Sequence, residues 1–335
     1  MEDLAVEESP GMHRYANPHG LPVLLEAIEN YAADRMSQPT DAGNILVTAG
    51  ATGGLGAVVG ALVSPGDEVL ILAPYWPLIA GIVRLFKGIP VEVPFIGNVD
   101  SRETILEVLS RYKTEKTTAI YLNTPNNPTG KNIPQKWMEA IGEWVREHQL
   151  WVISDEVYDQ YIYDGTAHTY MRELLPERTF SAFSFSKAYG MAGNRCGYVI
   201  GPADQMSICR RVSTHTFYST PTASQLAATR ALMLPEGKAW VSRARARYAD
   251  LGRAAATRLG EASPEGGTFL FIDVSEALHG RNLLSLLESC VDRGLLVAPG
   301  SSFGPYPNHI RLCFTSAEPD LVREGVEILA NLLGR

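Results

Sequence analysis

Short apolar runs alternate with amphipathic runs through the middle of the chain, and this alternation constrains the fold more than any other feature. The apolar runs are typical of buried strands and lie at 45–48, 68–72, 91–94, 118–123, 151–156 and 179–184. Runs with helical spacing lie between them, at 52–63, 75–86, 102–113 and 134–148. Strands separated by such helices form mostly parallel sheets that are covered on both faces. The sequence therefore predicts an α/β fold that binds its ligands at the carboxyl ends of the strands.

The alternating pattern ends near residue 215. The Ala- and Arg-rich stretch 221–260 then predicts two long helices. After it, we expect strands at 268–274, 295–298 and 309–314 and helices at 281–293 and 317–333, which together form a smaller α+β unit. A chain of 335 residues exceeds one ordinary core. We expect an N-terminal segment (1–25) that packs on the small domain or on a partner subunit, a large ligand-binding domain (26–235) and a small C-terminal domain (236–335).

The charge and the polar residues exclude several classes of function. The net charge is −8 without a long block of like charges, which argues against nucleic acid or an anionic membrane as the main partner. No apolar run approaches about 18 residues, so no membrane-spanning helix is expected. The acidic start, MEDLAVEES, lacks the features of a signal peptide, so we expect a cytoplasmic protein. The 4 Cys show no C-x-x-C spacing and the 7 His no ligand pair, so we expect reduced thiols and no metal site.

The stretch NILVTAGATGGLGAVVGAL (44–62) holds a glycine-rich turn between an expected strand and an expected helix. Gly50, Gly53 and Gly56 match the spacing of short-chain dehydrogenases that bind NAD, and residues 112–116 supply their Tyr-x-x-x-Lys pair. However, the second strand ends without the acidic residue that would bind the ribose. The Tyr and Lys also lie at the polar end of a surface-like helix. We therefore favour another phosphate at this helix N-terminus, with Gly53 and Gly56 allowing the helix to pack closely.

Three polar clusters follow expected strands, at 121–130 (YLNTPNNPTG), 153–158 (ISDEVY) and 184–197 (SFSKAYGMAGNRCG). Asp155 ends a buried strand, where a carboxylate is costly unless a cation or a donor pairs with it. Lys187 in a desolvated pocket would become a usable amine nucleophile. The serines and the arginine of the third cluster suit a phosphate dianion. Taken separately, an Asn/Pro turn, a helix cap and a surface loop would explain the same residues.

The third cluster resembles the lysine signature of the class I/II aminotransferases, which are pyridoxal-phosphate enzymes of fold type I. It agrees at Ser184, Ser186, Lys187, Gly190, Met191, Gly193, Arg195 and Gly197, and departs mildly at Cys196. NTPNNPTG and SDEVY resemble further blocks of the family, in the right order. So do RYANPHGLPVLLEAI, PGDEVLILAPYWP, GGTFLFIDV and HIRLCFTS. The likeness spans about residues 14–330. It implies a large domain with a mostly parallel seven-stranded sheet flanked by helices, and a smaller α+β domain.

The resemblance implies pyridoxal 5′-phosphate as the cofactor and gives the clusters their tasks. Lys187 would hold the cofactor as a Schiff base and act as the general base. Asp155 would pair with the protonated pyridine nitrogen. Tyr158 and Asn127 would bond to the ring hydroxyl oxygen, so that Lys187, Asp155 and Tyr158 form the catalytic set. Trp76 would stack on the ring and, with Asn127, line the place of the substrate.

The resemblance also implies how the phosphate and the substrate are held. The phosphate ligands would come from the glycine-rich turn and the lysine cluster, and they are Gly50, Ala51, Thr52, Ser184, Ser186 and Arg195. Tyr15 matches a tyrosine that reaches the phosphate of the neighbouring subunit, so we expect a homodimer with shared active sites. Arg311 matches the arginine that clamps the substrate α-carboxylate, a bidentate task that lysine performs poorly.

The implied activity is transfer of an amino group between an L-amino acid and a 2-oxo acid, with ping-pong kinetics. Because the cofactor supports other bond cleavages, a lyase, a cyclase or a decarboxylase on the same fold is the alternative. A non-catalytic sensor is disfavoured by the intact Lys187 and by the 14 residues before Tyr15, which leave no room for a DNA-binding unit.

Two departures bear on the substrate. Family members usually carry a few dozen residues before the block that begins near Tyr15, including a segment that folds over the substrate. Here 14 residues precede Tyr15, so we expect either a shortened sequence or a substrate enclosure that is built differently. Thr52 stands where many aspartate-preferring relatives carry lysine, and we therefore do not expect a strict aspartate enzyme.

Overall fold

The computed structural model describes residues 11–163 and 165–335. Its largest element is a seven-stranded sheet with the order β1-β7-β6-β5-β4-β2-β3. The strands are β1 (Ile45–Thr48), β2 (Glu68–Ala73), β3 (Ile89–Pro94), β4 (Thr117–Asn123), β5 (Trp151–Asp155), β6 (Thr179–Ser184) and β7 (Gly197–Ile200). Neighbouring strands are parallel except in the pairs that include β7. The prediction of a mostly parallel sheet is confirmed.

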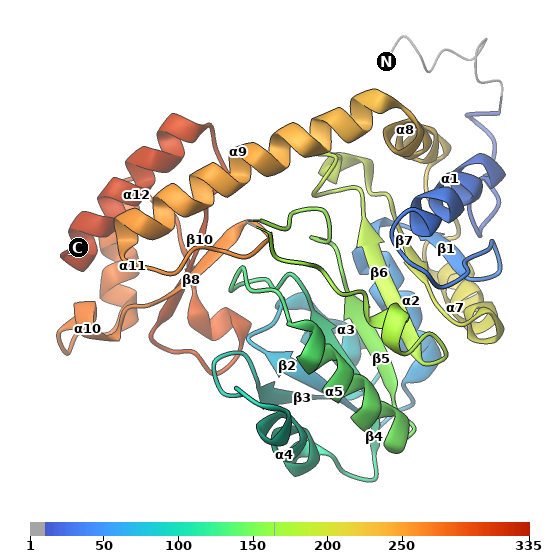
Figure 1. Ribbon diagram of the computed structural model, residues 1–335, viewed down its shortest axis with the longest axis horizontal. Helices are drawn as coiled ribbons and strands as arrows, with labels where there is room; N and C mark the ends of the chain where they lie inside the picture. Colours follow the sequence, from blue (N-terminus) through green and yellow to red (C-terminus); the bar gives the residue numbers. More distant parts are fainter. Residues whose placement is uncertain (1–10, 164) are drawn as a thin grey trace.

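Helices cover both faces of this sheet (Figure 1). One face packs against α2 (Gly50–Leu62), α3 (Leu78–Leu85) and α7 (Ala203–Thr216). The other face packs against α4 (Arg102–Tyr112), α5 (Gln135–Glu147) and α6 (Met171–Leu174) and, at its β1 end, α1 (Pro22–Ala33) and α8 (Thr222–Met233). Since helices cover both faces, the central strands β4, β5 and β6 are buried at nearly every position.

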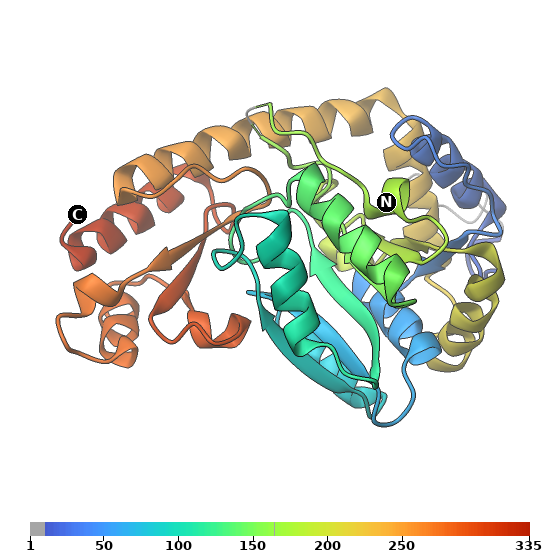
Figure 2. The ribbon, with the colours of Figure 1, turned by 60° about the horizontal axis from the view of Figure 1, so that its bottom comes forward.

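A second, three-stranded sheet has the order β8-β10-β9 and is antiparallel. It consists of β8 (Phe269–Asp273), β9 (Ala298–Pro299) and β10 (His309–Cys313), and it packs with α10 (Ser275–Leu278), α11 (Leu283–Val291) and α12 (Pro319–Leu333). The 25-residue helix α9 (Pro235–Leu259) contacts α8 at one end and α12 at the other. In Figures 1 and 2 it is the long orange helix that extends from α8 to α12.

Two predicted elements differ in the structure. The helix expected over 75–86 begins at Leu78, because Pro77 is tolerated only at the start of a helix. The strand expected at 295–298 is wrong, since β9 contains only Ala298 and Pro299. Gly294, with a φ of +77°, makes the turn that follows α11, and Pro299 has no N–H with which to extend the ladder.

The structure shows where the expected N-terminal segment packs and where α9 begins. Residues 1–10 of the expected N-terminal segment lie outside the described residues. The rest of it lies beside α8 and β1: the Leu21 N–H donates to Gln225 Oε1 over 2.7 Å, and the Val47 N–H donates to the His19 carbonyl over 3.1 Å. Because α9 begins at Pro235, we propose the division into domains at this residue.

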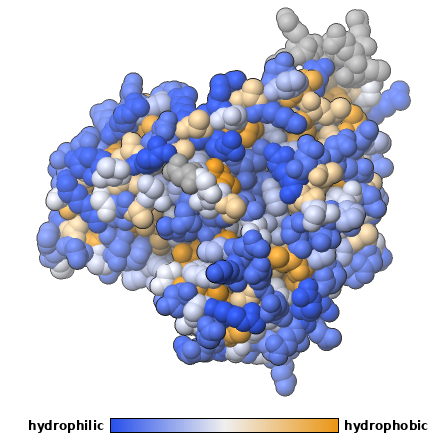
Figure 3. Space-filling model, viewed as in Figure 1, coloured by the Kyte–Doolittle hydropathy of each residue, from blue (hydrophilic) through white to orange (hydrophobic). Residues whose placement is uncertain are grey.

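The surface seen in Figure 3 is mostly hydrophilic, with apolar residues in small groups. Within residues 11–163 and 165–335, no helix has both the length and the apolar character to cross a bilayer.

Candidate active site

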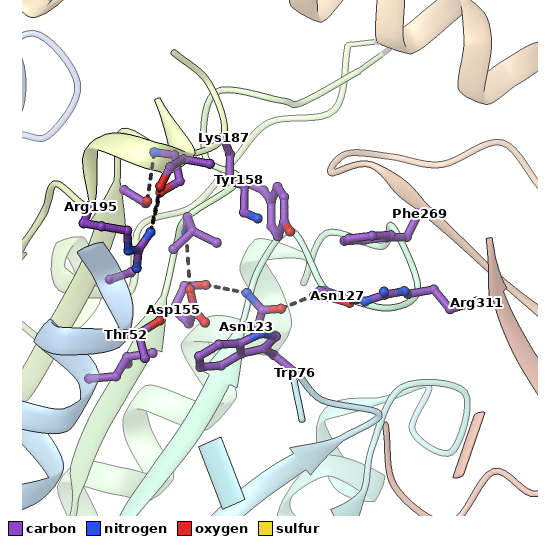
Figure 4. A pocket seen from close by; sticks show the side chains of 16 residues that line it. Thr52, Trp76, Asn123, Asn127, Asp155, Tyr158, Lys187, Arg195, Phe269 and Arg311 are labelled. Atoms are coloured by element: carbon purple, nitrogen blue, oxygen red, sulfur yellow. Dashed lines mark hydrogen bonds between the residues drawn. The ribbon is translucent and has the colours of Figure 1, made fainter. Parts of the chain in front are cut away.

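A cavity of about 300 Å³ lies where β2, β4, β5 and β6 end, between the seven-stranded sheet and β8 and β10 (Figure 4). It collects most of the predicted site residues: Ala51, Thr52, Trp76, Asn127, Asp155, Tyr158, Ser184, Ser186, Lys187, Arg195 and Arg311. Its other lining residues, which the sequence did not single out, are Leu55, Asn123, Val157, Ala192 and Phe269. The polar clusters of the sequence therefore meet in one place.

Lys187 lies three residues past the end of β6, in a loop held by Tyr161. The Tyr161 hydroxyl donates to the carbonyl oxygens of Lys187 and Ala188, over 3.0 Å and 3.3 Å. The Lys187 Nζ lies 5.8 Å from the centre of the Tyr158 ring. Burial lowers the pKa of the Lys187 amine, although the negative charge of Asp155 works in the opposite direction. Burial thus favours the unprotonated amine, which is the form that acts as a nucleophile.

Asp155 is the last residue of β5 and is 3% exposed. Burial raises the pKa of its carboxyl to about 6. Three neighbours work against this rise: the Tyr121 hydroxyl, which donates to Oδ2 over 2.7 Å, the Val157 N–H, which donates to Oδ1 over 3.4 Å, and the charge of Lys187. The carboxylate that the sequence marked as costly is therefore buried and faces a cavity in which a cation could pair with it.

The opposite end of the cavity is rich in donors. Helix α2 begins at Gly50, so the partial positive charge of its N-terminus faces the cavity at Ala51 and Thr52. Arg195 lies beside this turn. Its Nη1 also donates to the Ala192 carbonyl over 3.0 Å. Gly50 has a φ of +67°, and a Cβ there would lie 2.6 Å from Arg195 Nη2. Another residue would be strained in this conformation, and its Cβ would push the guanidinium away from the turn.

Backbone contacts fix the position of this turn and of the serines next to it. A Cβ on Gly197 of β7 would lie 2.7 Å from the Ala51 nitrogen, so β7 and the start of α2 touch through their main chains. The Ser186 N–H donates to Ser184 Oγ over 3.0 Å. The Ser186 hydroxyl in turn lies 3.5 Å from Arg195 Nη1. Hydroxyl, guanidinium and helix N-terminus thus converge, an arrangement that suits a phosphate dianion.

Arg311 enters the cavity from β10. Its guanidinium lies between two aromatic rings, with Cζ 4.3 Å from the centre of Phe269 and 4.7 Å from that of Phe303. Its Nη1 donates to Asn127 Oδ1 over 2.8 Å (Figure 4). Its Nε is buried and has no hydrogen-bond partner within residues 11–163 and 165–335. A buried N–H of a cation that lacks a partner favours the binding of a carboxylate, which would accept its hydrogen bond.

Asn123, at the end of β4, organises the loop that carries Asn127. Its Oδ1 accepts from the Asn127 N–H over 2.7 Å, and its Nδ2 donates to the Asp155 carbonyl over 2.8 Å. Because an arginine only donates, the Arg311 contact fixes Asn127 Oδ1 as the acceptor and leaves Nδ2 as a donor. Asn123 belonged to a cluster that the sequence had identified, but its role needed the strand register.

Two predicted site residues do not line the cavity: Gly50, which lies in the turn next to it, and Tyr15, which lies elsewhere. Tyr15 is 90% exposed, and its ring packs edge-on against Tyr218, with 5.4 Å between the ring centres. It lines a separate surface hollow with residues 219–223. Tyr112 and Lys116, the pair considered for a dehydrogenase, are not among the residues that line the cavity. Among the described residues, no group of three or more His, Cys, Asp or Glu could hold a metal ion.

Known proteins share both this sequence and this fold. The chain matches the model of the family "Aminotransferase class I and II" over residues 1–329. A probable aspartate/prephenate aminotransferase of Thermus aquaticus is 33% identical over 333 residues, which cover 96% of this chain and 84% of that protein. An arginine–pyruvate transaminase of Pseudomonas aeruginosa is 34% identical over 337 residues, with 97% and 84% covered.

Solved structures agree. An aromatic aminotransferase from Pyrococcus horikoshii has a TM-score of 0.89 at 30% identity, with 97% of this chain and 88% of that chain covered. The aspartate aminotransferase from Thermus thermophilus with maleate has a TM-score of 0.87 at 30% identity, with 97% and 85% covered. From the family match and these relatives, we conclude that the chain belongs to the aminotransferase class I and II family, whose enzymes use pyridoxal phosphate.

Proposed function

We propose that the cavity is the site at which this chain transfers amino groups between amino acids and 2-oxo acids, with pyridoxal phosphate held by the residues that line it. The observation that carries the proposal is the convergence of the Lys187 amine, the buried Asp155 carboxylate and a cluster of phosphate-type donors in one cavity. These are the three partners that an aldehyde, a pyridine nitrogen and a phosphate need.

The two ends of the cavity fit the two ends of the cofactor. Gly50 has no Cβ, which would otherwise fill the space at Arg195. The N–H groups of Ala51 and Thr52 and the guanidinium could therefore bind one phosphate. At the other end, Asp155 would pair with the ring nitrogen, which offsets the cost of its burial. Trp76 would lie against the ring.

When bound, the cofactor supplies a conjugated ring that accepts the electron pair released at the substrate Cα. The protein residues do the rest. Lys187 Nζ would carry the cofactor and, once an amino acid has replaced it there, would act as the base that moves the proton from the substrate Cα to the cofactor carbon. Asn127 Nδ2 and the Tyr158 hydroxyl would donate to the ring oxygen. Arg311 would hold the α-carboxylate and so orient the Cα–H bond.

We propose further that the favoured amino acids have neutral side chains. The cations among the described residues of the cavity are Lys187, Arg195 and Arg311, and each has a task already. Apart from these cations and Asp155, which would pair with the cofactor ring, the residues that line the cavity are neutral and include Thr52 and Leu55. The names of the relatives cover acidic, aromatic and basic substrates. The similarity to these relatives therefore does not indicate a substrate, and the preference for neutral side chains is supported by the residues that line the cavity.

A homodimer with shared sites is the third part of the proposal. Tyr15 and Tyr218 are both exposed, at 90% and 44%, and they contact each other outside the cavity of their own chain. Exposed paired aromatic rings are typical of a protein interface. Sedimentation velocity is expected to give twice the chain mass, and Tyr15→Phe to weaken cofactor binding about threefold to tenfold. A monomer with full cofactor affinity would contradict this part.

The reaction itself is tested by product analysis. The purified protein with pyridoxal phosphate is incubated with single amino acids and one 2-oxo acid, and mass spectrometry follows all products. We expect a new 2-oxo acid and a new amino acid in equal amounts, and neither with Lys187→Ala. Release of ammonia or CO₂ without a new amino acid would favour the lyase or decarboxylase alternative instead.

A further inference from the structure

Tyr121 is a buried phenol for which the proposed function has no task. It lies in the middle of β4, is 0% exposed and belongs to the apolar core beneath α2. A hydroxyl in such a core is costly unless it is hydrogen-bonded, and a phenylalanine would fill nearly the same volume. The oxygen atom therefore needs an explanation beyond packing.

The strand register brings this oxygen to Asp155. Tyr121 of β4 pairs with Ile153 of β5, and Asn123 pairs with Asp155. Tyr121 and Asp155 are thus diagonal neighbours on one face of the sheet, within reach of a long side chain. The Tyr121 hydroxyl donates to Asp155 Oδ2 over 2.7 Å. The other contact of the carboxylate, from the Val157 N–H to Oδ1, is longer, at 3.4 Å.

The charged and titratable groups around Asp155 come from several elements. Lys187, after β6, favours the ionised carboxylate, and Glu156, next in the chain, disfavours it. Glu156 has its own partners, since it accepts from Ser181 Oγ over 2.8 Å and from His168 Nε2 over 3.0 Å. Tyr158, which lines the cavity, also has a buried hydroxyl near the carboxylate. The phenol of Tyr121 is the close side-chain donor that opposes the desolvation of Asp155.

We propose that Tyr121 is a positioning residue that keeps the Asp155 carboxylate ionised and turned toward the cavity, and so extends cofactor binding to lower pH. This inference rests on the proposed function, because it requires that Asp155 pair with the cofactor ring. The phenol donates to Oδ2 and thereby stabilises the anion, and a protonated Asp155 could not pair with a ring nitrogen that carries its own proton.

The test compares cofactor affinity with pH. Full-length protein is freed of cofactor by dialysis, and pyridoxal phosphate is titrated back between pH 5.5 and pH 8.5 while tryptophan fluorescence is followed. The variant is Tyr121→Phe, which keeps the ring and removes one atom. The matched control is Tyr75→Phe: Tyr75 is also buried and donates to a carboxylate, Glu92 Oε1, over 2.6 Å, but Glu92 does not line the cavity.

The quantity to compare is the Kd of each variant divided by that of the unchanged protein, because the cofactor's own titrations cancel in this ratio. Loss of the phenol is expected to move the Asp155 pKa upward from about 6, by about one pH unit. For Tyr121→Phe the ratio is then about fivefold at pH 6 and less than about twofold at pH 8. For Tyr75→Phe it is expected to stay constant over the same range.

A second pair of variants tests whether the effect of Tyr121 depends on the charge of Asp155. With Asp155→Asn, which has no charge to stabilise, adding Tyr121→Phe is expected to produce no pH-dependent change. A ratio for Tyr121→Phe that does not vary with pH, or the same variation in the Asn background, would overturn the role of Tyr121. If the unchanged protein itself fails to bind pyridoxal phosphate, the proposed function fails, and this outcome is separate from the other two.

Discussion

Arg311 donates a hydrogen bond to Asn127 across the cavity, over 2.8 Å and 184 positions of sequence. The contact joins β10 of the three-stranded sheet to the loop after β4 of the seven-stranded sheet. It also couples two tasks, since the guanidinium that would hold the substrate carboxylate sets the orientation of the amide that would bond to the cofactor ring.

Arg311→Lys is expected to lower kcat/KM for amino acids by about 10- to 100-fold, because an ammonium group cannot make the paired contacts of a guanidinium. The affinity for pyridoxal phosphate should change little. Steady-state kinetics and the fluorescence titration measure the two effects. Arg323→Lys, at a surface ion pair with Asp320 on α12, serves as the control. Equal losses in the two variants would rule out a substrate role for Arg311.

Asp155→Asn is expected to stabilise the cofactor-free protein at neutral pH while it weakens cofactor binding. The carboxyl pKa is raised from 3.8 to about 6 in the folded chain. The folded state thus binds this proton more tightly, and above pH 6 the ionised group costs about 3 kcal/mol. This cost decreases as the pH falls from 6 to 4 and is absent below 4.

Urea unfolding at pH 8, 6 and 4 measures this difference. The advantage of Asp155→Asn should be largest at pH 8 and vanish at pH 4. Asp34→Asn, at an exposed position, should show no such trend. A stability difference for Asp155→Asn that stays the same at all three values would mean that burial does not destabilise its ionised form.

Gly50→Ala is expected to destabilise the cofactor-free protein by about 1–3 kcal/mol, the cost of a left-handed conformation at a non-glycine residue. It should also weaken cofactor binding, because the new Cβ would displace Arg195. Gly56→Ala in the same helix is the control: its Cβ would have no neighbour within 4 Å, and a helical alanine is favoured over glycine. Thermal unfolding and cofactor titration compare the two. Similar results for both would exclude a special role of the turn at Gly50.

Thr52→Lys is expected to raise kcat/KM for aspartate relative to alanine by about tenfold, because it adds a cation to a neutral wall of the cavity. Thr52→Met has a similar reach without the charge and should not change this ratio. If both variants shift it equally, size and not charge determines the preference at this position.

The sequence predicted the large sheet well, because most of its strands contain short apolar runs that alternate with amphipathic helices. It missed β7 (Gly197–Ile200), whose four residues follow a glycine-rich loop and are too short for a periodic signal. It also missed α1, since the first residues gave no clear pattern. Gly56 was expected to let α2 pack closely, and this expectation is wrong, because the space beside it is open. Gly54, which meets Val199 instead, has that role.

At the site, Lys187 and Asp155 could be recognised from their chemistry, since each is a polar residue at the end of a buried strand. Arg311 could not, because an arginine in a strand is unremarkable until the fold brings it to Asn127; only the likeness to a family identified it. Tyr121 and Phe269 lay within stretches that the sequence had identified, but nothing in the sequence indicated a role for either side chain. Their importance arises from strand register and from contacts between distant segments, which local spacing does not encode.

The main-chain contact between Gly197 and the start of α2 has a consequence for how such a site can change through mutation. It leaves no side chain between β7 and the turn at Ala51, so replacements elsewhere in the core cannot easily shift this turn. The opposite wall is built from side chains, such as Trp76, Phe269 and Arg311. One end of the cavity is thus held constant by the backbone, while the other can accumulate replacements that alter which amino acid is accepted.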